Sequence, residues 1–278
     1  MIKFIKSHKK WIVLGLLVIV FIVVYKPFLS PPKDADWQEH LKIASTAEFD
    51  GDAVTVRNVR NFRYSPTEAD IIPNYYDKTY NLREVEKVWY ITEPFNEATY
   101  AAHTFVSFEF KNGDFLAITI EARKAKGQKY SMGKGMLKTY PLIYIAADER
   151  DVVLLRANVR KDKVYVYPVK TSSPENPRLL LVDMLGRMNE LVEKPVWYNT
   201  LFASCTSSIA KHVNNITPGR ISSLSWQLYL TASADELALK SGLLDTDLSI
   251  DEARKKYLIN DKSEKAGDVL NYSNLIRQ

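Results

Sequence analysis

Cysteine is nearly absent from this chain, because Cys205 is the only one in 278 residues. A single thiol cannot form an intramolecular disulfide, so a fold held by disulfides is excluded. With 10 glycines and 12 prolines, the chain also lacks the composition of collagen or of disordered segments. It has no Cys-x-x-Cys, His-x-x-x-His, phosphate-loop or dinucleotide glycine pattern, so the sequence predicts no metal and no cofactor. A Gly-x-Ser-x-Gly elbow, which a serine hydrolase would need, is missing as well.

An extended basic surface is also lacking, although the net charge is +5. The whole excess comes from the N-terminal segment, where the only charged residues among the first thirty are Lys3, Lys6, Lys9, Lys10 and Lys26. Residues 31–278 are therefore neutral overall. Because a phosphate-binding surface needs clustered basic residues, we expect no nucleic-acid partner.

The N-terminus contains one long apolar run, Trp11–Tyr25. Because Lys26 can extend its charge toward the interface, the run continues through Leu29, close to the length of one bilayer crossing. The lysines before the run predict that residues 1–10 stay in the cytoplasm. A cleaved signal peptide is the alternative, but no small-residue cleavage site follows the run. We therefore expect a transmembrane signal anchor over residues 11–29, then a proline-rich tether and a short helix over residues 30–49.

The exported part mixes strand and helix patterns, with helices gathered toward the C-terminus, which indicates the α+β class. Strands are predicted over residues 54–64, 85–91 (or a short helix), 103–110, 115–123, 142–147, 152–157 and 163–169. Helices are predicted over residues 37–47, 178–192, 206–215 and most of 219–278. Turn-rich or loop segments are expected over residues 70–80 and 124–138. The pattern divides the exported part into a domain over residues 50–216 and a helical C-terminal extension over residues 217–278.

The clearest local pattern is a hairpin around Lys111–Gly113. Apolar residues alternate along its two strands, at Val106, Phe108, Phe110, Leu116, Ile118 and Ile120. A three-residue loop with Gly113 in the left-handed region places all of them on one face, whereas a two-residue Asn-Gly loop would send them to opposite faces. In the three-residue register His103 faces Glu121 directly. The sequence therefore predicts an imidazole and a carboxylate as cross-strand neighbours.

Cys205 lies where a helix is expected to begin. Asn199 and Thr200 are turn formers, and Ser204 is a suitable N-cap for a helix from Thr206. A cysteine in the first helical turn faces the positive end of the helix dipole, which lowers its pKa and favours the thiolate. The alternative is that Cys205 is a small buried apolar residue of the core.

A thiolate nucleophile needs a base, and the chain has four histidines. His8 precedes the anchor, His40 is near the tether, and His212 is two turns from Cys205 on the same predicted helix. His103 remains, already paired with Glu121 by the hairpin. Cys205, His103 and Glu121 therefore form a candidate nucleophile, base and orienting carboxylate. The alternatives are a structural histidine at a strand end and a Glu121 that pairs with Arg123 or Arg150.

Several motifs, in this order along the chain, resemble the Lnb N-terminal periplasmic domain family, long a domain of unknown function in Gram-negative bacteria. The motifs are Arg60-Asn61-Phe62-Arg63-Tyr64, His103-Thr104-Phe105-Val106-Ser107-Phe108, Ile120-Glu121-Ala122-Arg123, Glu149-Arg150-Asp151, and Tyr198-Asn199-Thr200 with Cys205-Thr206. The resemblance covers roughly residues 50–216. The order of histidine before cysteine is similar to the permuted NlpC/P60-like branch of papain-like enzymes, which includes lecithin:retinol acyltransferase-like proteins. Ser204 departs from the asparagine that we expect before the cysteine.

The resemblance implies a papain-like core, an antiparallel sheet with the histidine on a strand and the cysteine at a helix start. One member of the family is a lipoprotein N-acyltransferase, so the resemblance implies a thiol acyltransferase at the bacterial inner membrane, with its catalytic domain in the periplasm and a lipid or lipoprotein partner. Cys205, His103 and Glu121 fall on the catalytic positions, and Tyr64, Arg123, Tyr198 and Asn199 on substrate-binding ones. A cysteine peptidase or amidase of cell-wall peptides, and a non-catalytic binding domain, are the alternatives.

Overall fold

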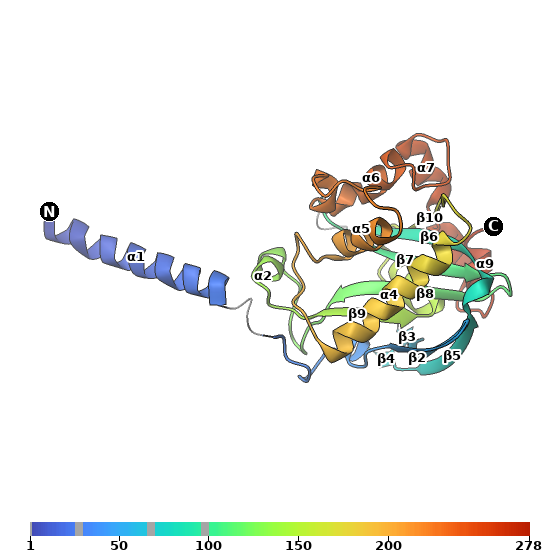
Figure 1. Ribbon diagram of the computed structural model, residues 1–278, viewed down its shortest axis with the longest axis horizontal. Coiled ribbons are helices and arrows are strands. Elements are labelled where there is room, and N and C mark those ends of the chain that lie inside the picture. The colour runs from blue at the N-terminus through green and yellow to red at the C-terminus, as the bar shows by residue number, and fades with distance from the viewer. Residues whose placement is uncertain (1, 26–29, 66–69, 96–99) are drawn as a thin grey trace.

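The computed structural model describes residues 2–25, 30–65, 70–95 and 100–278, with only the backbone for residues 2–9 and 22–24. The apolar run lies within helix α1 (Ile2–Tyr25), which stands apart from the other elements in Figure 1. Within the described residues, the structure has no helix long and apolar enough to cross a membrane. Residues 26–29, where the expected anchor ends, lie outside the described part.

One large sheet forms the centre of the molecule (Figure 1). Its strands are β1 (Thr46–Asp50), β2 (Ala53–Arg60), β5 (Tyr75–Asn81), β6 (Val85–Pro94), β7 (Ala102–Phe110), β8 (Phe115–Ala122), β9 (Leu142–Ala147) and β10 (Tyr165–Pro168). The order is β1-β2-β9-β8-β7-β6-β10, with β5 also paired to β2. Every pairing is antiparallel except the short parallel contact of β2 with β9. A separate two-stranded ribbon joins β3 (Arg63–Tyr64) to β4 (Ile71–Ile72).

Helices cover both faces of the sheet. One face carries α4 (Asn176–Glu193) and α5 (Cys205–Ile216), which pack on the alternating apolar residues of the hairpin. The other face carries α3 (Glu149–Leu154), the π-helical turn η4 (Leu155–Val159), α8 (Asn260–Ala266) and α9 (Tyr272–Leu275). The remaining helices are α2 (Met132–Met136), α6 (Ala234–Lys240), α7 (Ile250–Tyr257) and the 3-10 turns η2 (Glu39–Leu41), η3 (Leu82–Glu84), η5 (Trp226–Leu228) and η6 (Thr231–Ser233). The chain is thus mixed α+β, with a mostly antiparallel sheet and C-terminal helices, as the sequence predicted.

The hairpin has the predicted register. Phe105 pairs with Thr119 and Glu109 with Phe115, and Gly113 has a positive φ of 83° in the turn. The Phe110 amide donates to Asp114, which closes the three-residue loop. All six alternating apolar residues are buried in one core cluster. Their burial selects this register, because a slip by one residue would place the two apolar sets on opposite faces of the sheet.

The predicted strand over residues 152–157 is wrong, because this segment is helical in α3 and η4. Asp148 caps α3 by accepting the amide hydrogen of Arg150. Two buried ion pairs then fix the helix, from Arg60 to Asp151 and from Arg277 to Glu149. The β-branched residues favoured a strand locally, but the cap and these distant partners outweigh that preference.

Three other segments also differ from their predictions. Residues 37–47 contain only the turn η2 and the start of β1, instead of a helix. Residues 70–80 contain β4 and most of β5, and the loop over residues 124–138 contains α2. The predicted C-terminal extension packs against the sheet, because Ile259, Tyr272 and Ile276 belong to the same buried cluster as Phe105.

Candidate active site

Cys205 is the first residue of α5, which sets the position of its thiol. Ser204 is the N-cap, as predicted, and Ser204 and Ser207 form a reciprocal capping box. The cap satisfies the Ser207 amide, whereas the amides of the first helical positions have no acceptor within the helix. The serine that replaces the expected asparagine therefore still starts the helix at the cysteine.

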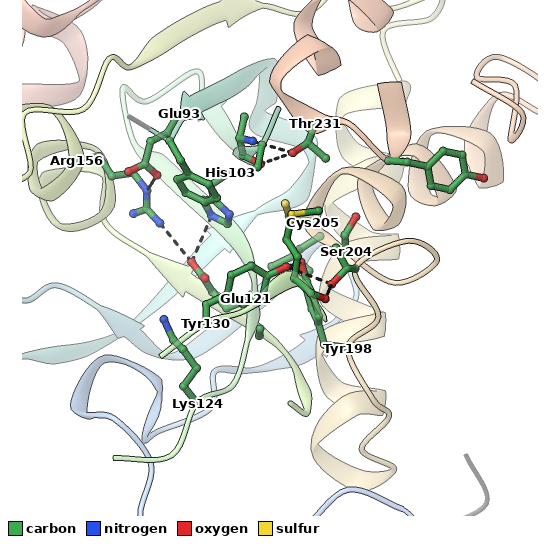
Figure 2. A pocket seen from close by; sticks show the side chains of 18 of the residues that line it. Glu93, His103, Glu121, Lys124, Tyr130, Arg156, Tyr198, Ser204, Cys205 and Thr231 are labelled. Atoms are coloured by element: carbon green, nitrogen blue, oxygen red, sulfur yellow. Dashed lines mark hydrogen bonds and ion pairs between the residues drawn. The ribbon is translucent and has the colours of Figure 1, made fainter. Parts of the chain in front are cut away.

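His103 lies on β7 and faces the start of α5. Its Nε2 atom is 2.7 Å from the Thr119 hydroxyl and 3.3 Å from Oε1 of Glu121. Because the Thr119 hydroxyl donates its hydrogen to Glu121, its oxygen lone pair is left to accept a hydrogen bond from Nε2–H. Nε2 is therefore the protonated nitrogen, and Nδ1 is the one available to the thiol. The thiol points toward this imidazole in Figure 2.

The three groups shift one another's pKa values. Burial would lower the pKa of His103, but Glu121 and the neighbouring Cys205 thiol raise it to about 9. Burial would raise the pKa of the Cys205 thiol, but His103 and Thr104 bring it below its usual value. Burial opposes ionisation of Glu121 too, yet His103 and Arg156 hold its pKa well below the usual range. His103 is therefore an imidazolium and Glu121 a carboxylate at neutral pH, and both His103 and Thr104 favour ionisation of the thiol.

A cavity of about 320 Å³ opens beside these residues (Figure 2). Cys205 and His103 are each only 6 % exposed, and both line it. Most of its other walls are aromatic or aliphatic, from Phe95, Ile120, Tyr130, Met132, Tyr198 and Tyr229. Charged side chains line another part, at Glu93, Glu121, Lys124, Arg156 and Arg160. The cavity can therefore take a substrate with an apolar portion beside a polar group.

The predicted substrate-binding residues are not all at this cavity. Tyr198 lines it. Asn199 supports the turn before α5, because its Oδ1 accepts the amide hydrogens of Leu201 and Phe202. Tyr64 instead donates to Asp151, in the buried network of Arg60. The role of Tyr64, Tyr198 and Asn199 in binding substrate stays a prediction.

Arg123 binds the N-terminal part of the domain. Its guanidinium donates to the carbonyl oxygens of Leu41 and Lys42 and lies over the ring of Trp37. Arg123 therefore does not pair with Glu121, and Arg150 pairs with Asp148 and Asp268. The role of Arg123 as a substrate ligand also stays a prediction.

The other described histidines serve other parts of the fold. His212 is buried on α5 between the Tyr144 hydroxyl, at 2.8 Å, and Asp183, at 2.6 Å. Burial lowers its pKa. Burial and the charge of Arg60 lower the pKa of His40 to about 4. As expected from its helical spacing, His212 lies two turns away from Cys205 on α5.

Sequence reasoning missed four residues that complete the site. Arg156 and Glu93 lie behind His103, and Tyr229 and Thr231 come from the C-terminal part. The Thr231 hydroxyl binds both the amide and the carbonyl of Ala102, at the start of the strand that carries His103. Glu93 carried a signal, because it closely follows the apolar run Val88-Trp89-Tyr90-Ile91, and a carboxylate buried beside such a run needs a partner. Among the described residues, no group of three or more His, Cys, Asp and Glu side chains is placed to hold a metal ion.

Fold and site together define an α+β domain in which a cysteine at a helix start faces a histidine on a strand. The model of the Lnb N-terminal periplasmic domain family matches residues 72–232, more than half of the chain, and the chain belongs to this family. The match confirms the family that the motifs indicated. It reaches beyond residue 216 and so includes Tyr229 and Thr231 of the cavity. Comparisons with curated proteins and with solved structures gave no match.

Proposed function

We propose that this chain is a membrane-attached periplasmic thiol acyltransferase, which carries an acyl chain from a lipid or lipoprotein as a thioester on Cys205. The observation that carries the proposal is the facing pair of Cys205 and His103 beside a mainly apolar cavity. A strand histidine and a helix-start cysteine are also the arrangement expected of a papain-like, permuted NlpC/P60-like core. The apolar walls favour an acyl chain over a charged substrate.

The reaction follows from the protonation states. The Cys205 thiolate attacks the ester carbonyl carbon, and the amide hydrogen at the start of α5 stabilises the oxyanion. As the carbon–sulfur bond forms and the ester carbon–oxygen bond breaks, the His103 imidazolium gives its proton to the leaving alcohol oxygen. An amine or hydroxyl acceptor then attacks the thioester, and neutral His103 takes the proton of the acceptor. The thiolate leaves, and the starting ion pair is restored.

Helix α1 is proposed to hold the domain at the bacterial inner membrane. Its large apolar side chains from Trp11 to Phe21 are each between 49 and 68 % exposed. Such an exposed apolar surface is unusual for a soluble protein, and a membrane would cover it. The cavity would then work next to its lipid substrate. Fractionation of cells that express the full chain or residues 30–278 tests this part, because only the full chain should sediment with membranes.

Acyl transfer is tested by incubating the full chain with radiolabelled phospholipid or diacylated lipopeptide. We expect an adduct on Cys205 that hydroxylamine removes at neutral pH, since thioesters are cleaved under these conditions. Cys205→Ala should give no adduct, and Cys205→Ser should trap a hydroxylamine-resistant oxyester. Because Cys205 is the only thiol, the label identifies its site directly. Absence of any adduct from all lipids and lipopeptides contradicts the proposal.

A cysteine peptidase or amidase is the second candidate, favoured by the charged residues Lys124 and Arg160 in the cavity wall. The same thiolate would then attack an amide carbonyl of a cell-wall peptide. Release of a new amine from muropeptides by the wild type, and not by Cys205→Ala, supports this candidate. A protein that shows neither activity would be a binding domain.

A further inference from the structure

Arg156 is the most buried cation beside the candidate site. Its side chain is 5 % exposed and contacts two carboxylates, with Nε donating to Glu93 and Nη2 lying 3.3 Å from Glu121. Nη1 donates to the Val152 carbonyl of the preceding helix. Figure 2 shows the guanidinium behind His103, on the side away from Cys205.

The two carboxylates come to His103 from different strands. Glu93 is the cross-strand partner of His103 on β6, and Glu121 approaches Nε2 from β8. The guanidinium also lies over the ring of Phe105, which stacks on the imidazole of His103. One cation thus touches both carboxylates and the ring that stacks on the imidazole.

The backbone around Arg156 is unusual as well. Arg156 is in the π-helical turn η4, where the widened turn follows the regular helix α3. Such single π turns are frequent at functional sites. Ion pairs of Asp151 with Arg60 on β2 and of Glu149 with Arg277 near the C-terminus fix α3, so the turn presents Arg156 from a fixed position.

We propose that Arg156 is a positioning residue of the site: it holds Glu121 against the imidazole of His103 and offsets the charge of the two carboxylates that flank this ring. Without the guanidinium, the negative charges of Glu93 and Glu121 would be less compensated. His103 would then bind its proton more tightly. An imidazolium that is too weak an acid protonates the leaving group slowly. Arg156 therefore keeps the proton affinity of His103 low enough for the imidazolium to protonate the leaving group.

The charged and titratable groups that face His103 are Glu121 from β8, Glu93 from β6, Arg156 from η4 and Cys205 from α5. Lys124 acts on Glu121, and Asp162 acts on Glu93. Arg156 touches both carboxylates. Its removal is therefore expected to raise the proton affinity of His103.

The test measures the titration midpoint of His103 by NMR of the full chain in detergent, with histidine labelled at the Cε1 carbon and His103→Gln for assignment. We expect Arg156→Gln to raise the midpoint by about one pH unit, since a nearby charge shifts a pKa by this order. Arg156→Lys keeps the charge and should stay closer to the wild type. Glu93→Gln alone removes a carboxylate and should not raise the midpoint.

Arg156→Gln leaves the buried Glu93 without its cation, which can unfold the protein. The double variant Glu93→Gln with Arg156→Gln removes both buried charges in similar shapes and decides the question in that case. Its midpoint should still rise, though less. A folded variant without Arg156 whose His103 midpoint is unchanged or lower overturns the proposal.

The catalytic part of this inference depends on the proposed acyl transfer, and the two fail separately. If lipids leave no adduct on Cys205 but the midpoint rises as described, the proposed function is wrong and the role of Arg156 stands. If the adduct forms and the midpoint does not rise, only the role of Arg156 is wrong. If both hold, Arg156→Gln should slow adduct formation by about tenfold, with little change in lipid binding.

Discussion

The imidazole of His103 and the carboxylate of Glu121 meet across two neighbouring strands, with 3.3 Å between Nε2 and Oε1. The register of β7 and β8 creates this contact, since the pairing of Phe105 with Thr119 places His103 opposite Glu121 two residues further on. Thr119 donates to Glu121 and so orients the carboxylate. The hairpin turn at Gly113 thereby places Nε2 of the imidazole next to the carboxylate.

Replacing Glu121 is expected to change the acid strength of His103. Glu121 is the main group that raises the pKa of His103, which reaches about 9 against the effect of burial. Glu121→Gln should therefore lower the titration midpoint of His103 by more than about one pH unit. NMR of labelled histidine measures the shift. Glu48→Gln, which removes an exposed carboxylate of β1, serves as the control and should leave the midpoint unchanged.

Replacing His103 is expected to make Cys205 a poor nucleophile. Burial alone would raise the pKa of this thiol, and His103 is the main group that lowers it. In His103→Gln the rate of alkylation by iodoacetamide at pH 7 should fall about tenfold or more, because the thiolate is the reactive form. His212→Gln is the matched control, since His212 contacts Tyr144 and Asp183 instead. Equal rates in His103→Gln and the wild type would contradict the ion pair.

The stability of the domain should depend on pH through His103. Its pKa is raised to about 9 in the folded state, above the unfolded value of about 6.5. This difference stabilises the fold fully below pH 6.5, by about 3 kcal/mol, and the gain is lost as the pH rises through 9. Urea denaturation of the wild type between pH 6 and pH 10 should show this decline. His103→Gln should show a flatter curve.

Asp151→Asn is expected to destabilise the fold strongly. The Asp151 carboxylate accepts two hydrogen bonds from Arg60, at 2.8 and 3.0 Å, and others from Phe62 and Tyr64. Both charged side chains are almost fully buried. Loss of one partner in such a pair costs about 3–5 kcal/mol, because the other charge stays buried. Urea denaturation measures the loss, and Glu48→Gln at the exposed pair with Arg57 should cost less than about 1 kcal/mol. A similar loss in both variants would contradict the importance of burial.

The candidate site was predictable where local patterns determine it. Alternating apolar residues set the register that pairs His103 with Glu121, and the turn and cap residues set the start of α5 at Cys205. The meeting of Cys205 with His103 required the family resemblance, because nothing local joins residues about a hundred positions apart. That resemblance is now confirmed by the family match.

The parts that were missed depend on long-range contacts. Val152 and Val153 favour a strand locally, but Asp148 caps a helix there and Arg60 and Arg277 bind its acidic residues. The same error hid Arg156, because a strand would have placed its side chain differently. Thr231 escaped notice for a related reason, since its bonds to Ala102 join residues 129 positions apart.

Gly135 joins two walls of the cavity. A side chain at this position of α2 would overlap the hydroxyl of Thr200, which donates to the Met132 carbonyl in the same helix. The segment that presents Tyr130 and Met132 is thus fastened to the turn that leads into Cys205. A ligand that displaced the wall of Tyr130 and Met132 would also displace the turn at Thr200, so the size of the ligand and the position of the Cys205 thiol are coupled through this contact.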